Sequence, residues 1–252
     1  MKKAERVFGL HAVTSLLERN PARVSLLLAL ESRDDARMQQ VLALADKANV
    51  PVRRVARREL DALVPGVSHQ GVVAETGGAP GLGEKDLQSF VEALVQPAFL
   101  LVLDGVQDPH NLGACLRSAA AAGVDAVIIP KDRSVPLNST VRKVACGAAE
   151  TVPVVRVTNL ARTLRALKDS GVWIYGAAAE AEATLYETDL CGALALVLGG
   201  EGKGLRRLTR EHCDGLLAIP MAGSLSSLNV SVATGVCLFE ARRQRDRART
   251  AE

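Results

Sequence analysis

The feature that most constrains this chain is a series of short, continuous apolar runs in its C-terminal part. Residues 99–103, 126–130 and 194–198 are made of Leu, Val, Ile, Ala and Phe, with one Pro. Such runs are typical of strands buried on both faces, since a strand with one wet face would alternate apolar and polar residues. Helical patterns, among them 112–122, 139–148, 160–170 and 230–247, lie between or after the runs. Their alternation predicts an α/β domain with a parallel sheet covered on both sides.

A glycine-rich segment separates this region from a smaller one. Residues 76–83 read TGGAPGLG, a composition typical of flexible linkers. A chain of 252 residues is comfortable for two domains. We therefore expect a small α/β domain over 1–75, a linker and lead-in helix over 76–96, and the larger domain over 97–252. In the small domain we expect strands at 24–30, from 50 and at 71–74, a helix that starts near residue 10, and helices at 34–49 and 59–63.

Cysteine usage and hydropathy bound the class of protein. The five cysteines are odd in number and show no CxxC spacing, which predicts a reduced, cytoplasmic chain without a metal site. No apolar run approaches the roughly 20 residues that a membrane helix needs. The N-terminal segment has no cleavage-site pattern, so we expect no export signal and no membrane partner.

The net charge of the chain says little about its binding partners, but the distribution of its basic residues says more. The formal net charge is only +3, but arginines cluster at Arg53-Arg54, at Arg206-Arg207 and over 242–249. Clustered arginines suit phosphate contacts, although a solvated helix face explains any single cluster equally well. Aromatic residues make up 3% of the chain, which disfavours a base-stacking platform. If RNA binds, we expect recognition by charge and shape.

The stretch 194–231 predicts a ligand cleft. One apolar run ends in the glycine-rich segment 199–204, a second ends at Pro220, and a polar loop follows over 224–229. Strand ends of this kind build ligand sites in α/β proteins.

The common nucleotide fingerprints do not fit this stretch. A Walker-type loop needs glycine five positions before Gly202 and Ser or Thr after Lys203, and the chain has Val197 and Gly204 there. A dinucleotide fingerprint fails as well, because Leu205 and Arg207 stand where glycine is required. We therefore expect neither ATP nor NAD in their usual modes.

A second candidate region lies upstream, over residues 103–117. Asn111 stands where the N-cap of a helix over 112–122 is expected. Gly113 and the neighbouring alanines suggest a smooth helix face that a ligand backbone could approach. Arg117 lies among small and apolar residues, which favours a functional role over a surface ion pair.

Three segments together resemble a known pattern. DPHNLGACLRSAAAAGVDAVII, LVLGGEGKGL and IPMAGSLSSLNVSVATGVCLFEA are similar to the three signature motifs of the SpoU/TrmH RNA 2′-O-ribose methyltransferases of the SPOUT superfamily. The resemblance covers about residues 97–245, with the motifs in the right order and spacing. The N-terminal region, with FGLHAV and HQGVVA, resembles the L30e-like RNA-binding domain of rRNA-modifying members.

The resemblance implies a fold, a cofactor and partners. The family's parallel-sheet domain contains a deep trefoil knot and works as a homodimer, commonly through the last helix. S-adenosylmethionine (SAM) would be held by backbone groups of three loops, whose residues here are Leu198, Gly199, Gly200, Ile219, Pro220, Met221, Ser227 and Leu228. The implied substrate is a guanosine ribose in the peptidyl-transferase P-loop of 23S rRNA, as free rRNA or in a large-subunit assembly intermediate. Two alternatives remain: methylation of tRNA or another rRNA site, and a non-catalytic RNA-binding factor in ribosome assembly.

The resemblance also implies a polar catalytic set: Asn111, Arg117, Glu201, Ser227 and Asn229. The family's arginine is proposed to help deprotonate the ribose hydroxyl. Arginine is a poor base, with a pKa above about 12, so we expect Arg117 to grip the adjacent phosphate and stabilise the developing alkoxide. Glu201 would orient Arg117 or the ribose, and Ser227 and Asn229 would fix the loop around cofactor and nucleotide.

Overall fold

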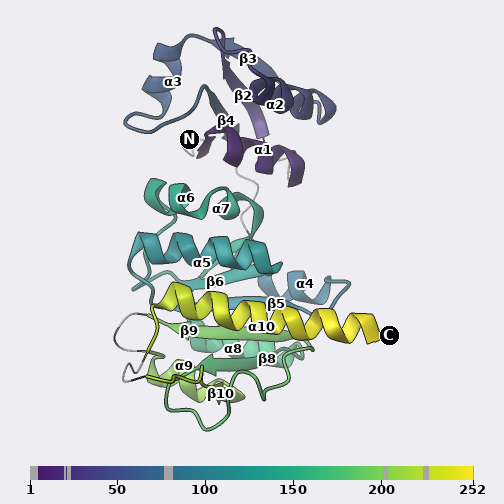
Figure 1. Ribbon diagram of the computed structural model, residues 1–252, viewed down its shortest axis with the longest axis vertical. Helices are drawn as coiled ribbons and strands as arrows, with labels where there is room; N and C mark the ends of the chain where they lie inside the picture. Colours follow the sequence, from purple (N-terminus) through teal and green to yellow (C-terminus); the bar gives the residue numbers. More distant parts are fainter. Residues whose placement is uncertain are drawn as a thin grey trace. The chain divides into compact units, whose positions relative to one another are not determined.

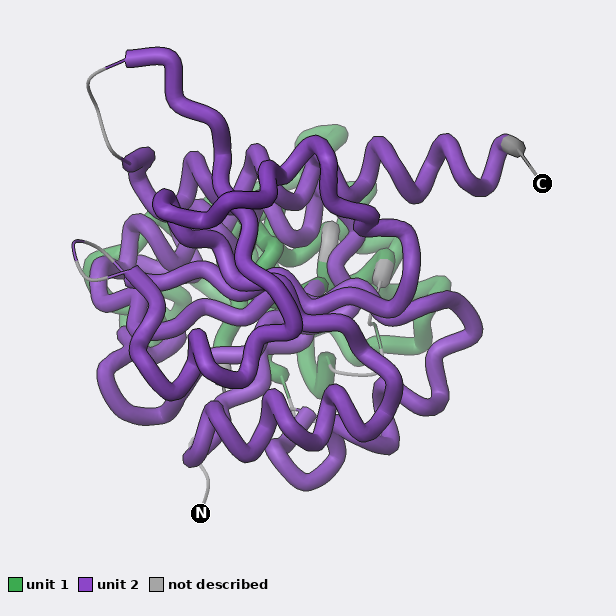
Figure 2. Tube along the Cα trace, turned by 90° about the horizontal axis from the view of Figure 1, so that it is seen from below, with its two compact units in different colours: residues 1–81, 146–151 green, residues 82–145, 152–252 purple. Residues whose placement is uncertain are grey.

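The computed structural model describes residues 5–19, 21, 24–76, 82–200, 202, 204–223 and 227–251. The chain forms two compact units, coloured separately in Figure 2. Unit 1 comprises residues 1–81 and 146–151, and unit 2 comprises residues 82–145 and 152–252. Among the described residues, no helix has the length and apolar character to cross a membrane. In the same residues, no His, Cys, Asp and Glu side chains are grouped to hold a metal ion.

Unit 1 contains a four-stranded sheet in the order β1-β4-β2-β3. β2 and β3 run parallel, and β4 pairs antiparallel with β1 and with β2. The elements are β1 Glu5–Phe8, α1 Leu10–Arg19, β2 Val24–Leu30, α2 Ala36–Lys47, β3 Val52–Val55, α3 Arg57–Leu63 and β4 Val72–Thr76. The sequence interpretation missed β1, because a four-residue edge strand takes its conformation from its pairing with β4 and has no clear pattern of its own.

The helix α2 shows how the sequence sets this unit. The Asp35 carboxylate accepts hydrogen bonds from the backbone N–H groups of Arg37 and Met38, at 3.1 and 3.2 Å, and so caps the helix. Met38, Val41 and Ala45 lie at helical spacing and are fully buried. The cap and the apolar stripe together define both the start of α2 and the face that it buries.

Unit 2 contains a six-stranded parallel sheet in the order β10-β8-β9-β5-β6-β7. The strands are β5 Phe99–Asp104, β6 Ala126–Pro130, β7 Val154–Val157, β8 Trp173–Ala177, β9 Leu194–Gly199 and β10 Gly215–Leu217. The helices are α4 Leu87–Glu92, α5 Pro109–Ala122, α6 Ser139–Ala145, α8 Leu160–Asp169, α9 Arg207–Glu211 and α10 Val230–Ala251, and α7 Ala148–Thr151 belongs to unit 1. The parallel sheet predicted from the apolar runs is confirmed.

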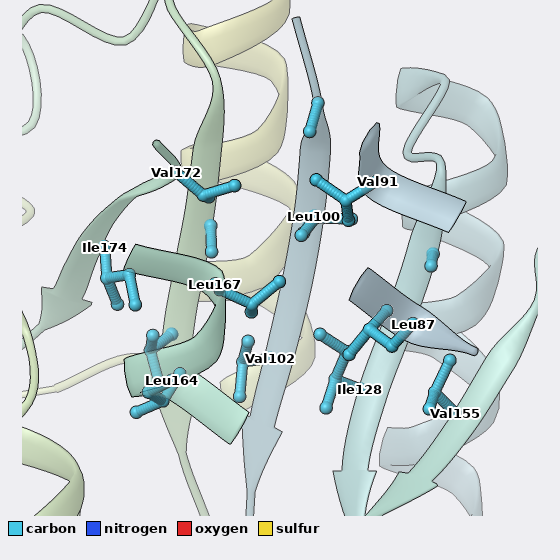
Figure 3. Packing of buried hydrophobic residues seen from close by; sticks show 14 of the residues in the cluster. Leu87, Val91, Leu100, Val102, Ile128, Val155, Leu164, Leu167, Val172 and Ile174 are labelled. Atoms are coloured by element: carbon cyan, nitrogen blue, oxygen red, sulfur yellow. The ribbon is translucent and has the colours of Figure 1, made fainter. Parts of the chain in front are cut away.

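Helices cover both faces of the sheet. Leu87 and Val91 of α4 and Leu164 and Leu167 of α8 pack on one face, against side chains such as Val102 of β5 (Figure 3). On the other face, α5 and α10 lie side by side in front of the sheet (Figure 1). Both faces of the central strands are therefore buried, as their continuous apolar sequences require.

The start of α5 differs from the expectation. The helix begins at Pro109, and the Asp108 carboxylate caps it by accepting the His110 N–H at 3.0 Å. Proline fits the first helical position, where the missing N–H would be unsatisfied anyway. Asn111 therefore lies in the first turn and is not the cap, which leaves its side chain available for other contacts.

The expected smooth face around Gly113 is also wrong. Gly113 is buried, and a β-carbon there would lie 2.7 Å from Val144 Cβ and 2.9 Å from the Val141 carbonyl oxygen. The missing side chain lets α5 pack closely against α6, which carries both Val141 and Val144. The glycine serves helix packing, and no ligand backbone has access to that face.

We predict that Gly113→Ala destabilises the protein by about 2 kcal/mol. Overpacking against Val144 and Val141 costs about 1–3 kcal/mol, and the better helix propensity of alanine recovers up to about 1 kcal/mol. Chemical denaturation measures the difference. Gly192→Ala is the matched control, because a β-carbon there meets no atom within 4 Å. Equal free energies of unfolding for the two variants would contradict the packing argument.

Candidate functional site

A pocket of about 560 Å³ lies at the carboxyl end of three neighbouring strands, β10, β8 and β9. The segments that follow these strands and the first turn of α10 form its wall. Most of the lining residues are small or aliphatic. They are Ala177, Ala178, Ala179, Glu180, Leu198, Gly199, Gly200, Gly202, Gly204, Leu205, Arg210, Leu217, Ile219, Met221, Ser227, Leu228, Asn229, Val230 and Ala233.

Two glycines at the end of β9 allow the backbone to fold tightly there. A β-carbon on Gly199 would lie 2.1 Å from the carbonyl carbon of Gly204, and one on Gly200 would lie 2.3 Å from the Gly105 oxygen. Gly200 and Gly204 form an isolated bridge, so the chain after β9 turns back on itself. Any side chain at Gly199 or Gly200 would collide with main-chain atoms. The glycines are therefore required by the shape of the pocket wall.

A buried carboxylate fastens this segment to the end of β5. The Asp104 side chain is fully buried and accepts the backbone N–H of Arg206 at 3.1 Å and its Nε–H at 2.5 Å. The second terminal nitrogen of Arg206 forms an ion pair with the same carboxylate. The Asp104 carbonyl oxygen accepts the Gly200 N–H at 3.0 Å. Asp104 thus holds both the beginning and the end of residues 200–206.

Asn229 connects the pocket to α5. Its Oδ1 accepts the backbone N–H and the hydroxyl of Ser231, at 2.8 and 2.6 Å, which caps the start of α10. Its Nδ2 donates a hydrogen bond to Asn111 Oδ1 at 3.1 Å. Asn229 therefore acts as a helix cap and at the same time links two regions that are 118 residues apart in the chain.

The structure brings most of the predicted site residues together. Seven of the eight expected cofactor residues line the pocket, as does Asn229: Leu198, Gly199, Gly200, Ile219, Met221, Ser227 and Leu228. Pro220 is exposed and lies between two lining residues without lining the pocket itself. Asn111 reaches the site through Asn229.

The two charged residues of the expected catalytic set are Arg117 and Glu201. Arg117 is exposed on α5 and does not line the pocket. It follows Asn111 by six positions, about 9 Å along the helix axis. Glu201 lies outside the described residues.

The sequence interpretation missed the segment after β8 and Arg210. Residues 177–180 and Arg210 line the pocket, and Arg210 forms an ion pair with Glu180. The hydrogen bond from Arg210 lowers the pKa of the Glu180 carboxyl, so Glu180 stays ionised at neutral pH. The signal was present in the chain, because β8 ends in a run of alanines and the ends of neighbouring parallel strands share one edge. What the sequence did not show was that β8 neighbours β9.

Two family models match the chain. The model of the SpoU rRNA Methylase family matches residues 98–239. The model described as RNA 2′-O ribose methyltransferase substrate binding matches residues 6–80. Together they span most of both units.

Individual relatives agree with these matches. The chain is 58% identical to the 23S rRNA (guanosine-2′-O-)-methyltransferase RlmB of Pseudomonas putida, over 97% of this chain and 98% of the relative. The SpoU methyltransferase AviRb from Streptomyces viridochromogenes has the same fold, with a TM-score of 0.78 at 23% identity, covering 97% of this chain and 91% of that chain. An AdoMet-bound rRNA methyltransferase from Sinorhizobium meliloti superposes with a TM-score of 0.72 at 25% identity, covering 94% and 86%.

We predict that Asn229→Ala lowers the free energy of unfolding by about 1 kcal/mol, the usual loss for an asparagine cap. Asn229→Asp keeps an oxygen for Ser231 but loses the donor to Asn111. The Asp variant should therefore retain most of the stability in urea denaturation. Equal losses for the two variants would show that the link to Asn111, and not the cap, provides the stability.

Proposed function

The chain belongs to the SpoU rRNA methylase family, and on that premise we propose that it transfers a methyl group from SAM to the 2′-hydroxyl of a guanosine ribose in 23S rRNA. The nearly full-length similarity to a 23S rRNA guanosine methyltransferase supports the substrate. The observation that carries the proposal is the hydrogen bond from Asn229 to Asn111. It joins a pocket suited to the cofactor to the helix that bears Arg117.

The pocket fits SAM in size and in lining. Its volume of about 560 Å³ falls in the range of about 300–1,000 Å³ that small-molecule sites occupy. Its lining is mostly glycine, alanine and aliphatic residues, which suit the apolar faces of an adenine. We propose that Leu198, Gly199, Gly200, Ile219, Pro220, Met221, Ser227 and Leu228 hold the cofactor. When bound, SAM supplies a methyl group that is already activated by its sulfonium.

The remaining chemistry falls to side chains that position and activate the ribose. Arg117 is exposed, as a residue that meets an RNA backbone must be. We propose that its guanidinium grips a phosphate next to the target nucleotide and stabilises the alkoxide that develops on the 2′-oxygen. This role suits a guanidinium better than that of a base, because arginine keeps its proton in proteins. Glu201 would orient Arg117 or the ribose.

Asn111, Ser227 and Asn229 complete the proposed catalytic set. Asn111 and Asn229 hold one another, so each limits the freedom of the other at the mouth of the pocket. Ser227 lines the pocket two residues before Asn229. We propose that the three fix the ribose against the cofactor, since precise orientation lowers the barrier of a transfer between two bound reactants.

Further family properties belong to the proposal. They are a trefoil knot in unit 2, an L30e-like RNA-binding role for residues 1–75, a linker and lead-in helix over 76–96, and methylation of free 23S rRNA or of an assembly intermediate. Because ribosomes are assembled in the bacterial cytoplasm, we place the enzyme there. The match of residues 6–80 to a substrate-binding model favours methylation of RNA over the alternative of a structural assembly factor.

We predict that the protein methylates unmodified 23S rRNA with labelled SAM, and that Arg117→Ala abolishes most of the turnover while SAM affinity is retained. Loss of an electrostatic stabiliser of this kind costs about 100- to 1,000-fold in kcat. Primer extension at low dNTP maps the methylated ribose, and calorimetry measures the SAM dissociation constant.

Arg165→Ala is the control for this experiment, because Arg165 is also an exposed helical arginine but lies on α8. Transfer to tRNA instead of 23S rRNA would support the alternative substrate. SAM binding without transfer to either RNA would overturn the proposed activity. Loss of SAM binding in Arg117→Ala would show that Arg117 supports cofactor binding and not the transfer step.

We also propose a homodimer that uses the exposed side of α10. Val232 and Phe239 are seven positions apart, on the same side of the helix, and are 51% and 50% exposed. We expect Phe239→Glu to convert the dimer to a monomer in size-exclusion chromatography with light scattering, because a buried unpaired charge opposes association. Val95→Glu is the control, since Val95 is fully exposed outside α10. A wild-type monomer would exclude this interface.

A further inference from the structure

The ion pair between Asp104 and Arg206 lies beside the pocket, and neither residue lines it. Asp104 is the last residue of β5, and the register of the sheet places it opposite Gly199, the last residue of β9. Its side chain has no exposed surface, while that of Arg206 is 38% exposed. A carboxylate this deeply buried needs several hydrogen bonds and a counter-charge, and Arg206 provides both.

The pair connects the segments that carry the two halves of the proposed site. Asp104 leads, through a short loop, to α5 with Asn111 and Arg117. Arg206 directly precedes α9, whose Arg210 lines the pocket. Residues 200–206 run between Gly200, which is bonded to the Asp104 carbonyl, and Arg206, which is bonded to the Asp104 carboxylate. One residue thus fixes both ends of the glycine-rich pocket wall relative to β5 and α5.

We propose that Asp104 and Arg206 are positioning residues for methyl transfer: the pair keeps the cofactor-binding glycine segment in register with the residues of α5. This inference rests on the proposed function. Gly199 and Gly200 allow the close backbone approach but cannot make the segment stiff, because glycine restricts the backbone least of all residues. The ion pair between Asp104 and Arg206 restrains the segment, which its glycines cannot do.

The test uses the full-length protein with Asp104→Asn. Asparagine preserves size and can still accept the Arg206 N–H, but it removes the charge. Since a displacement of about 1 Å at a reacting centre can cost about 100-fold, we expect kcat to fall by about that factor and SAM to bind more weakly. KM for rRNA should stay near the wild-type value, because the pair holds the cofactor side of the site.

Asp214→Asn is the matched control. The Asp214 carboxylate also accepts a backbone N–H, from Ile174 at 2.9 Å, and pairs with a cation, Lys168 at 2.6 Å. Asp214 lies just before β10 and bonds near the start of β8, so it is at the amino ends of the strands, whereas Asp104 is at the carboxyl end of β5. We expect this variant to lose thermal stability with SAM affinity and kcat within twofold of wild type. The proposal would be overturned if, for the same decrease in Tm, Asp214→Asn lost as much kcat as Asp104→Asn.

Two variants of the partner make the test independent of whether Asp104→Asn folds. Arg206→Lys keeps a cation and the backbone N–H, so we expect partial rescue, whereas Arg206→Gln should bind SAM more weakly than the lysine variant. Indistinguishable SAM dissociation constants and kcat for wild type, Lys and Gln would overturn the proposal.

The SAM measurements separate this inference from the proposed function. A wild-type protein that binds SAM but methylates no RNA would disprove the activity, and the order of SAM affinities among the Asp104 and Arg206 variants would still decide the role of the pair. A wild-type protein that binds no SAM would overturn both.

Discussion

The approach of one backbone to another at the end of β9 is the constraint on which the site depends. Gly199 and Gly200 contact main-chain atoms of Gly204 and Gly105 at distances that exclude a β-carbon. Gly199 and Gly200 both line the pocket, and the Asp104 carbonyl oxygen accepts the Gly200 N–H. This part of the pocket wall is therefore formed by residues without side chains. The apolar strands of unit 2 are the rigid support that such a wall requires.

Much of the fold is readable from the sequence, and the exceptions have physical reasons. The strands at 24–30 and 126–130 were predicted with their observed bounds, because continuous apolar runs with clear limits leave little choice. The single helix expected over 139–148 is wrong. α6 ends at Ala145, and Cys146 follows with a φ of 51°. A left-handed cysteine has no local sequence signal and is imposed by tertiary structure.

The candidate site was predictable where it depends on local sequence and not where it depends on strand order. The glycine segment and the loop before α10 were identified because turn residues follow apolar runs. The contribution of Ala177–Glu180 was not, since only the order of strands in the sheet brings β8 beside β9. Likewise, no pattern in the chain indicates that Asp104 contacts Arg206, which lies 102 residues away.

The separation of Arg117 from the pocket follows from the electrostatics of the proposed reaction. A sulfonium is positively charged, and the pocket lining is largely uncharged, with Glu180 and Arg210 among the lining residues forming an ion pair. Arg210 is balanced by Glu180, whereas an unpaired guanidinium inside the pocket would repel the sulfonium of a bound cofactor. An exposed arginine on α5, outside the pocket lining, avoids this repulsion, and its positive charge would attract a phosphate. Methyl transfer to an alkoxide also neutralises the sulfonium charge, so apolar walls favour the reaction. A pocket in which the lining residues Glu180 and Arg210 pair with each other, with Arg117 outside it, therefore fits the proposed chemistry.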